Sequence, residues 1–447
     1  MTSQSRKVLF IWAVALFVSV STLVLIFAFG FRYDFKNNVL TKTGSLVLKP
    51  NTEAQIFIDD ESEGRTSFLN NTFSKKQLLP GKYMVKVQKD KHFSWQKEVE
   101  VKEGLVSDFS RIVLFSQNQV EQVSVNGKSP LFIDREGQKA IYWEKDSVSF
   151  YEVGGSQPIY KSEPIVLDSA TLKVLWGAEG KEAVVYDKSK VFYFDLSKKT
   201  FKAMGFSRQY SLENAVLKNG GIYFLKDKDL FVLSTGNLKS KIISKNLISF
   251  SIHKNEIFAL ATNSDGPKLI KMGLNAEGEQ VLGGFPAGNS KPAGIIKKVE
   301  YRDGDYYLLI DSGLYLLKDS QITLTNSNIA GFAISPDNTA LGWHNDHEFW
   351  VEWIKDAESQ PLKKAGEKEL VGKVPKNIQG FSWYKNGGYV FLELEDGLTV
   401  LETDLRGGAN MYTILVPNSQ EQAWYDLNQD KIFKLSALSG LAAIDVP

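Results

Sequence analysis

The sequence predicts an all-β protein with an N-terminal single transmembrane helix, a small β-sandwich and then a seven- or eight-bladed β-propeller. Three observations lead to this prediction: an uncharged apolar run near the N-terminus, short segments of alternating polarity after it, and units that repeat about every 40 residues over the rest of the chain. The expected boundaries are 1–30 for a cytoplasmic tip and the helix, 31–43 for a linker, 44–116 for the sandwich and 117–447 for the propeller.

Residues 8–29 form the apolar run, which is interrupted only by Ser19, Ser21 and Thr22. A helix of this length spans roughly 33 Å at about 1.5 Å per residue, enough to cross a hydrocarbon core of about 30 Å. The run is longer than the roughly 7–15 apolar residues of a cleaved signal and follows a short basic start, which favours an uncleaved signal-anchor. We therefore expect a single-pass cell-membrane protein with residues 31–447 outside the cytoplasm, although Ala28-Phe29-Gly30 resembles a cleavage site.

Composition excludes several classes of function. The chain has no cysteine, which rules out disulfide bridges, thiolate zinc sites and cysteine nucleophiles. It carries 53 Lys and Arg against 52 Asp and Glu, and no basic stripe is visible, so we expect no nucleic-acid partner.

Residues 44–115 show the period-two alternation of β-strands. In one of these segments Val99 and Val101 face one way, while Glu98, Glu100 and Lys102 face the other. This pattern predicts a one-sided antiparallel sheet packed on a partner sheet. Five strands are expected, in the segments GSLVLKP, AQIFIDD, YMVKVQKD, KEVEVKEG and FSRIVLF, separated by turns such as Pro80-Gly81 and Asp59-Asp60.

This region resembles the PEGA domain, most specifically in the turn Leu79-Pro80-Gly81-Lys82-Tyr83. Two departures are visible: the Pro-Glu-Gly-Ala string reads Pro50-Asn51-Thr52-Glu53-Ala54, and the usual Asp-Gly turn is Asp59-Asp60. The resemblance implies a small β-sandwich of bacterial and archaeal surface proteins with a binding or spacer role and no catalysis. The other matching positions are Gly44, Ile56, Ile58, Gly64, Thr66, Val85, Val87, Phe93, Trp95, Val99, Val101 and Gly104.

From about residue 120 the chain repeats a unit that runs from Trp through a polar turn and two apolar strands to Asp. Clear copies occupy residues 176–195, 383–404 and 424–445, and a variant with the turn Ser335-Pro336-Asp337-Asn338 occupies 332–354. Further units begin near 131, 222, 250 and 299, which makes eight in all, with seven blades as the alternative. Repeats of this size indicate propeller blades, because each small sheet needs neighbours on both faces. The units resemble TolB-like and WD-type propeller repeats.

Candidate metal ligands are few, since the chain has four histidines. His344 and His347 flank Asn345-Asp346, which we read as a two-residue hairpin turn that sets the histidines opposite each other. They could share a metal with Asp346 or Glu348, but two ligands without a defined third are weak evidence, and an exposed turn with a polar cross-strand pair is the favoured reading. We therefore predict no metal and no cofactor, and keep both histidines as possible binding residues.

The tryptophans are the better candidates for binding. Most are expected in the cores between blades. Trp176, Trp383 and Trp424 lie at strand ends before turns, from where some could reach a rim or the central funnel and stack on a sugar or a partner's side chains.

The leading hypothesis is a membrane-anchored extracytoplasmic binding or scaffold protein that presents the propeller to a surface (envelope) protein or a cell-wall polysaccharide. The alternative is a tethered propeller enzyme acting on glycans, for which the acidic pairs Asp303/Asp305 and Glu393/Glu395 would be candidates. No nucleophile elbow, P-loop or zinc-protease motif is present, so we expect no catalytic residues.

Overall fold

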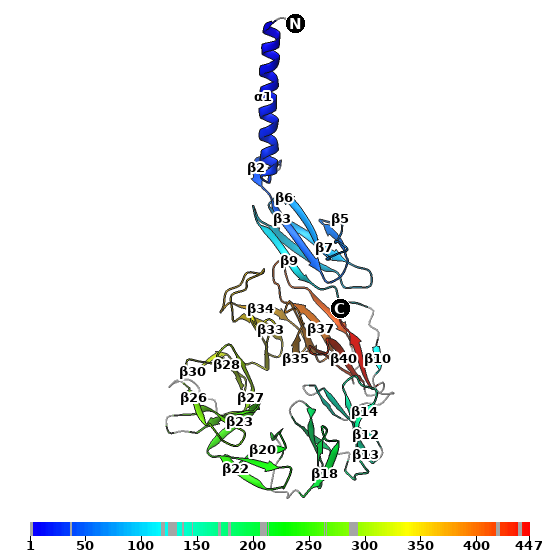
Figure 1. Cartoon of the computed structure of the whole chain (residues 1–447), viewed down its shortest axis with the longest axis vertical. Helices are drawn as coiled ribbons and strands as arrows, with labels where there is room; N and C mark the ends of the chain where they lie inside the picture. The colour runs from blue at the N-terminus through cyan, green and yellow to red at the C-terminus, as the bar shows by residue number, and fades with distance from the viewer. Residues whose placement is uncertain are drawn as a thin grey trace.

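The structure is a computed structural model that describes residues 3–447, except 36–37, 118–120, 124–131, 136–137, 145, 169–170, 178–179, 206–211, 213, 263, 265, 286–293, 417–420 and 437–439. It consists of a long N-terminal helix, a hairpin, a β-sandwich and a ring of small sheets (Figure 1). The predicted all-β fold with one apolar helix is confirmed.

The N-terminal helix α1 runs from Ser3 to Ala28. Its segment Lys7–Ala28 is long and apolar enough to cross a membrane, a test that a signal sequence would also pass. Gly30 ends the helix with a φ of 83°, a left-handed conformation that glycine adopts without steric cost. A hairpin follows at once, formed by β1 (Phe31–Asp34) and β2 (Val39–Lys42).

The sandwich contains two sheets, of three and four strands. The first has the order β6-β3-β9 and the second β5-β4-β7-β8. The sheet that holds Val99 and Val101 is antiparallel throughout, as predicted, whereas in the partner sheet β3 and β9 pair in parallel. The last strand returns beside the first in the same direction, which sends the chain away from the helix and toward the propeller. The bounds are β3 (Gly44–Pro50), β4 (Gln55–Ile58), β5 (Glu61–Arg65), β6 (Phe73–Leu78), β7 (Gly81–Gln88), β8 (Trp95–Val101) and β9 (Val106–Ile112).

The ring is a β-propeller whose described residues form eight four-stranded units, here called blades 1 to 8. The larger of the two expected numbers of blades is therefore the one observed. Blades 4 and 5 are joined into one sheet by a single parallel bridge between Gly284 and Gln321. Blade 8 takes its outermost strand, β10 (Glu121–Val123), from the start of the propeller, and the other three from its end. This exchange closes the ring, because the two ends of the propeller share one sheet.

The strands of blades 1 to 4 are β11 (Phe132–Asp134), β12 (Lys139–Glu144), β13 (Ser147–Glu152), β14 (Pro158–Lys161); β15 (Lys173–Trp176), β16 (Glu182–Tyr186), β17 (Val191–Asp195), β18 (Thr200–Met204); β19 (Val216–Lys218), β20 (Gly221–Lys226), β21 (Asp229–Ser234), β22 (Ser240–Ser244); β23 (Leu247–His253), β24 (Glu256–Ala261), β25 (Lys268–Gly273) and β26 (Gln280–Gly284). Those of blades 5 to 8 are β27 (Ile296–Arg302), β28 (Asp305–Ile310), β29 (Gly313–Lys318), β30 (Gln321–Asn326); β31 (Gly331–Ile334), β32 (Ala340–His344), β33 (Glu348–Trp353), β34 (Lys368–Lys373); β35 (Ile378–Trp383), β36 (Tyr389–Leu394), β37 (Gly397–Glu402), β38 (Met411–Leu415); β39 (Glu421–Asp426), β40 (Lys431–Ser436) and β41 (Gly440–Asp445).

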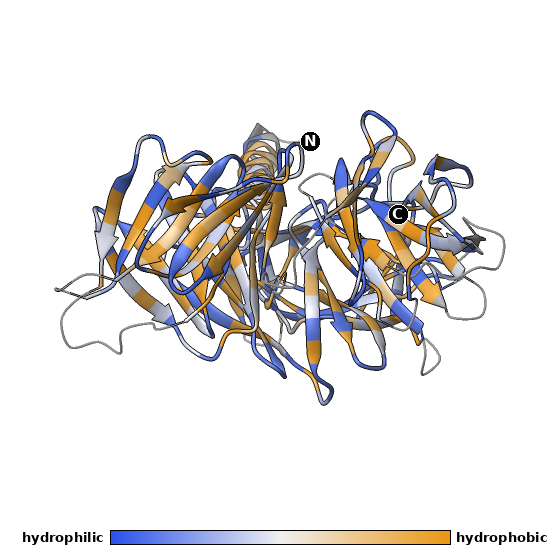
Figure 2. Ribbon diagram, turned by 90° about the horizontal axis from the view of Figure 1, so that it is seen from below, coloured by the Kyte–Doolittle hydropathy of each residue, from blue (hydrophilic) through white to orange (hydrophobic). Residues whose placement is uncertain are grey.

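The propeller has two non-equivalent faces. Because each blade is antiparallel, its first and third turns lie on one face, and its second turn and the link to the next blade lie on the other. The sandwich sits over the first of these faces at blades 6 and 7, since its contacts go to the first turn of blade 7 and to the third turns of both blades. We call this the sandwich face and the opposite one the free face. Figure 2 shows apolar residues along the strands and hydrophilic residues in the connecting loops.

Candidate functional site at the junction of sandwich and propeller

The five residues singled out from the sequence do not form one site. Trp383 and Trp424 are each only 3% exposed, and Trp176 is partly buried in the cluster between blades 1 and 2. The Trp383 indole donates to the Ala333 carbonyl of blade 6 at 3.0 Å. These two buried tryptophans therefore offer little ring surface for stacking, because packing between blades takes up their faces.

The histidine hairpin differs from its prediction by one residue. Asn345 N–H donates to the Glu348 carbonyl at 3.1 Å, so Asp346 and His347 are the two central residues of the turn. His344 pairs with Phe349 instead of His347 and is 2% exposed, and burial lowers the pKa of its imidazole. His347 is exposed on the free face. The register shift thus separates the two histidines, and within the described residues no group of three or more His, Cys, Asp or Glu could hold a metal.

Trp424 belongs instead to a contact that spans a blade. The Arg135 guanidinium of blade 1 lies 4.5 Å above the Trp424 ring of blade 8 and forms an ion pair of 2.6 Å with Glu393 of blade 7. The contact ties three blades together beside the position where the ring closes.

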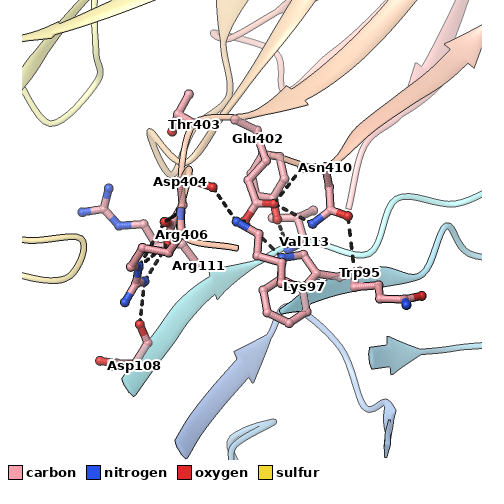
Figure 3. A network of polar contacts seen from close by, with 12 residues as sticks. Trp95, Lys97, Asp108, Arg111, Val113, Glu402, Thr403, Asp404, Arg406 and Asn410 are labelled. Carbon is pink, nitrogen blue, oxygen red and sulfur yellow. Dashed lines mark hydrogen bonds and ion pairs between the residues drawn. The ribbon is translucent and has the colours of Figure 1, made fainter. Parts of the chain in front are cut away.

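A buried cluster of hydrogen-bonded polar side chains lies between β8 of the sandwich and the end of β37 in blade 7 (Figure 3). Lys97 and Glu402 form an ion pair of 3.0 Å with side chains 0% and 6% exposed. The Trp95 indole donates to the same carboxylate at 3.0 Å, and the Asn410 amide donates to its other oxygen at 2.7 Å. Lys97 also donates to the Asp404 carbonyl. Burial raises the pKa of Glu402, although Lys97, Trp95 and Asn410 oppose that shift.

Arg406 forms a second set of contacts between the sandwich and the propeller, beside the Lys97–Glu402 pair. Its guanidinium makes a two-pronged contact with the Asp404 carboxylate, at 3.0 and 2.6 Å, and lies 4.0 Å from the Phe109 ring of β9. It also donates to the Asp108 carbonyl at 2.8 Å and to the Gln360 side chain at 2.5 Å. Gln360 belongs to the loop 354–367 of blade 6, which reaches the sandwich and donates to the Val106 carbonyl at 2.8 Å. The planar guanidinium therefore joins a sandwich strand to loops from two blades.

The segment that leaves the sandwich serves both domains. Ile112 and Leu114 lie in the sandwich core, whereas Val113 and Phe115 lie in the cluster formed by blades 7 and 8. The Val113 N–H donates to the buried Tyr389 hydroxyl at 3.1 Å. An extended chain points alternate side chains in opposite directions, so four consecutive residues fill two cores.

A cavity of about 440 Å³ opens beside the junction, between β9, the loop 354–367 and blades 6 and 7. Its lining combines two buried tryptophans with charged groups of both signs. Arg111 faces Asp337 at 3.5 Å, Lys355 pairs with Asp303 at 2.7 Å, and Asp356 pairs with Lys364 at 2.7 Å. Burial raises the pKa of Asp337, but donors from Ser335 and Thr339 and the charge of Arg111 outweigh it and hold the pKa below its usual value. The lining includes Arg111, Asp337, Trp353, Lys355, Asp356 and Trp383.

This cavity suits a polar ligand without strong net charge. Its lining holds three cationic side chains and five carboxylates, so a phosphate or a polyanion would find no surplus positive charge. Cavities at domain junctions with a few oriented polar groups are typical of ligand sites.

Sequence reasoning missed the junction, although one signal was available. Lys97 occupies the same strand face as Val99 and Val101, so the alternation that predicts their burial also predicts an inward lysine. Glu402 carries no such signal, because every residue of β37 is buried.

The fold defines the chain as a β-propeller protein. No protein-family model matches the sequence, the PEGA domain included, and no curated protein matches it. Solved structures with similar folds include the C-terminal WD40 domain of Sif2, at 11% identity and a TM-score of 0.43, covering 74% of this chain and 97% of that one. Another is the β-propeller domain of Myceliophteria thermophila Cps50 (Swd1), at 12% identity and a TM-score of 0.38, covering 73% of this chain and 98% of that one. A third is dihydro-heme d1 dehydrogenase NirN in complex with DHE, at 12% identity and a TM-score of 0.40, covering 65% of this chain and 68% of that one. At these identities the likenesses concern the fold alone.

Proposed function

We propose that this protein is a membrane-anchored, extracytoplasmic binding or scaffold protein, in which the sandwich is a rigid stalk and the propeller is the recognition domain. The buried Lys97–Glu402 junction is the observation that carries the proposal. Buried charges tolerate only geometries that keep them paired, which agrees with a stalk that holds a recognition surface in one orientation. The single apolar helix, read as a signal-anchor, supports the membrane location.

The junction cavity is the recognition site that we propose. Its polar groups of both kinds suit a peptide segment of an envelope protein or the hydroxyl and amide groups of a cell-wall polysaccharide. The PEGA-like pattern of the sandwich agrees with a spacer role in a surface protein.

The rival function, a tethered enzyme acting on glycans, needs two carboxylates brought together in one site. Each carboxylate that the sequence offered for it has a partner of its own. Asp303 pairs with Lys355, Asp305 with Lys318, Glu393 with Arg135, and Glu395 accepts from Asn377. We therefore favour binding over catalysis.

Site-directed photo-crosslinking on intact cells tests the proposal. A photoreactive residue at Glu358, on the rim of the cavity, is compared with one at His347, on the free face of the same blade. Reproducible attachment of one envelope protein or of wall glycan at position 358 alone supports the cavity as the recognition site.

The other outcomes are equally informative. Attachment at position 347 alone moves recognition to the free face and overturns the cavity. Protection of both positions from protease added to intact cells overturns the extracytoplasmic location. Turnover of purified wall glycan by the full-length protein would replace binding with catalysis.

A further inference from the structure

The short hairpin β1–β2 is tied closely to the end of the apolar helix. Only Phe29 and Gly30 separate α1 from β1. At the other end of the hairpin, the Thr43 N–H and hydroxyl both donate to the Gly30 carbonyl, at 2.8 and 2.7 Å. Wherever the helix ends, the hairpin must therefore lie within a few residues of that point (Figure 1).

The two faces of this hairpin differ in chemistry. Arg32 and Asp34 lie on the face turned toward the sandwich, since Arg32 donates to Gln77 of β6 at 2.8 Å. Burial, Asp59 and Asp34 together raise the pKa of the Tyr83 phenol in β7, which places Asp34 on the same side. Polar contacts thus occupy the face that meets the protein.

The opposite face is apolar and uncovered by the described chain. Tyr33 stands directly opposite Leu40, so the two side chains share that face, and they are 44% and 51% exposed. The Phe35 ring at the tip lies 5.0 Å from the Tyr33 ring and is 84% exposed.

We propose that this apolar face of the hairpin lies in the headgroup region of the bilayer and binds lipid as a second, in-plane anchor. The inference rests on the proposed function, because it requires α1 to span the membrane. Aromatic side chains concentrate at the level where a hydrocarbon core meets water, which is the level at which α1 ends. The hairpin then restricts how far the sandwich can lean toward the membrane.

The absence of cysteine makes spin labelling a direct test. The full-length protein is reconstituted in vesicles of phosphatidylcholine and phosphatidylglycerol, with one nitroxide on Leu40→Cys, Val39→Cys or Val18→Cys. Val39 is a matched control, because it neighbours Leu40, is 48% exposed and lies on the opposite face. Collision rates with oxygen, which concentrates in lipid, and with a water-soluble nickel chelate are compared.

We expect the labels at 18 and 40 to collide mainly with oxygen and the label at 39 mainly with the chelate. If the label at 18 is in lipid but the labels at 39 and 40 are equally open to the chelate, the hairpin proposal is overturned and the anchor stands. A label at 40 shielded from both reagents also overturns it, in favour of a protein contact. Chelate access at 18 overturns the anchor itself, and the hairpin proposal with it.

Discussion

The two ends of the sandwich are joined to their neighbours in contrasting ways. Toward the propeller, three features form a continuous interface. They are the buried Lys97–Glu402 ion pair, the Arg406 side chain that bonds to both domains, and the segment 112–115 that packs into both cores. Toward the helix, the contacts include the Thr43–Gly30 bonds, a backbone bond from Gly104 to Thr43 and one exposed arginine–glutamine bond. Buried charges tolerate only geometries that keep them paired, whereas exposed bonds can exchange with water. We therefore expect the sandwich and propeller to move as one body, with any swivel at the helix.

The largest expected effect comes from Lys97→Ala. It leaves the Glu402 carboxylate buried without its counter-charge, so we expect a loss of about 3–5 kcal/mol in the free energy of unfolding. Without Lys97 the pKa of Glu402 rises further, and an acid whose folded-state pKa is raised loses stability as the pH rises through that value. Denaturant unfolding of the detergent-solubilised protein should show a larger loss at pH 8 than at pH 5.

Two controls sharpen this prediction. Lys82→Ala removes the exposed lysine that pairs with Glu98 across β7 and β8, and should leave unfolding unchanged. Replacing both Lys97 by Met and Glu402 by Leu should restore most of the stability, because neither charge is then left alone. A loss in the double variant as large as in Lys97→Ala would contradict the role assigned to the pair.

Arg406→Lys is expected to have the next largest effect. A lysine cannot reproduce the two-pronged contact with Asp404 or the stacking on Phe109, so we expect a loss of roughly 1–3 kcal/mol. Arg32→Lys at the other end of the sandwich should change the unfolding midpoint little, because Arg32 is exposed and makes one hydrogen bond. If Arg406→Lys and Arg32→Lys lowered the free energy of unfolding equally, the contrast between the two ends of the sandwich would be contradicted.

Asp337→Asn tests a charged residue that lines the cavity between the sandwich and the propeller. The folded-state pKa of Asp337 is lowered, so its ionised form stabilises the fold above the unfolded value of about 3.9, and this contribution is lost as the pH falls through the folded-state pKa. We expect the variant to lose about 0.5–1 kcal/mol at pH 7. The difference from the unsubstituted protein should shrink as unfolding curves are measured at pH values progressively below the unfolded value of about 3.9. A difference that grows toward acid would contradict the assignment.

The smallest effect on stability is expected for Arg32→Ala, which should instead change motion. Distances between pairs of spin labels are measured in membrane-reconstituted protein, one pair joining the helix to the sandwich and the other joining the sandwich to the propeller. The first distribution should broaden in the variant, while the second stays narrow. Broadening of the distances between sandwich and propeller would contradict the expectation that these two domains move as one body.

Local sequence patterns predicted much of the fold. Alternation in KEVEVKEG placed Val99 and Val101 in a core, and the Trp-to-Asp units indicated blades of the observed size. Turn registers were less predictable: the histidine hairpin shifted by one residue because Asn345 pairs with Glu348, and that shift separated His344 from His347. A period-two pattern changes face with every such slip, so predictions that depend on register fail first.

The sequence by itself determined the apolar helix, the strand-rich architecture and the eight repeating units, because each depends on periodicity within about 40 residues. Only the tertiary structure decided the junction. Lys97 and Glu402 are 305 residues apart in the chain, and neither side chain predicts the other. The same holds for Arg135 and Glu393, which meet only because the ring closes. Pairs of this kind depend on where the ring closes and where the sandwich docks, and both result from packing across the whole molecule.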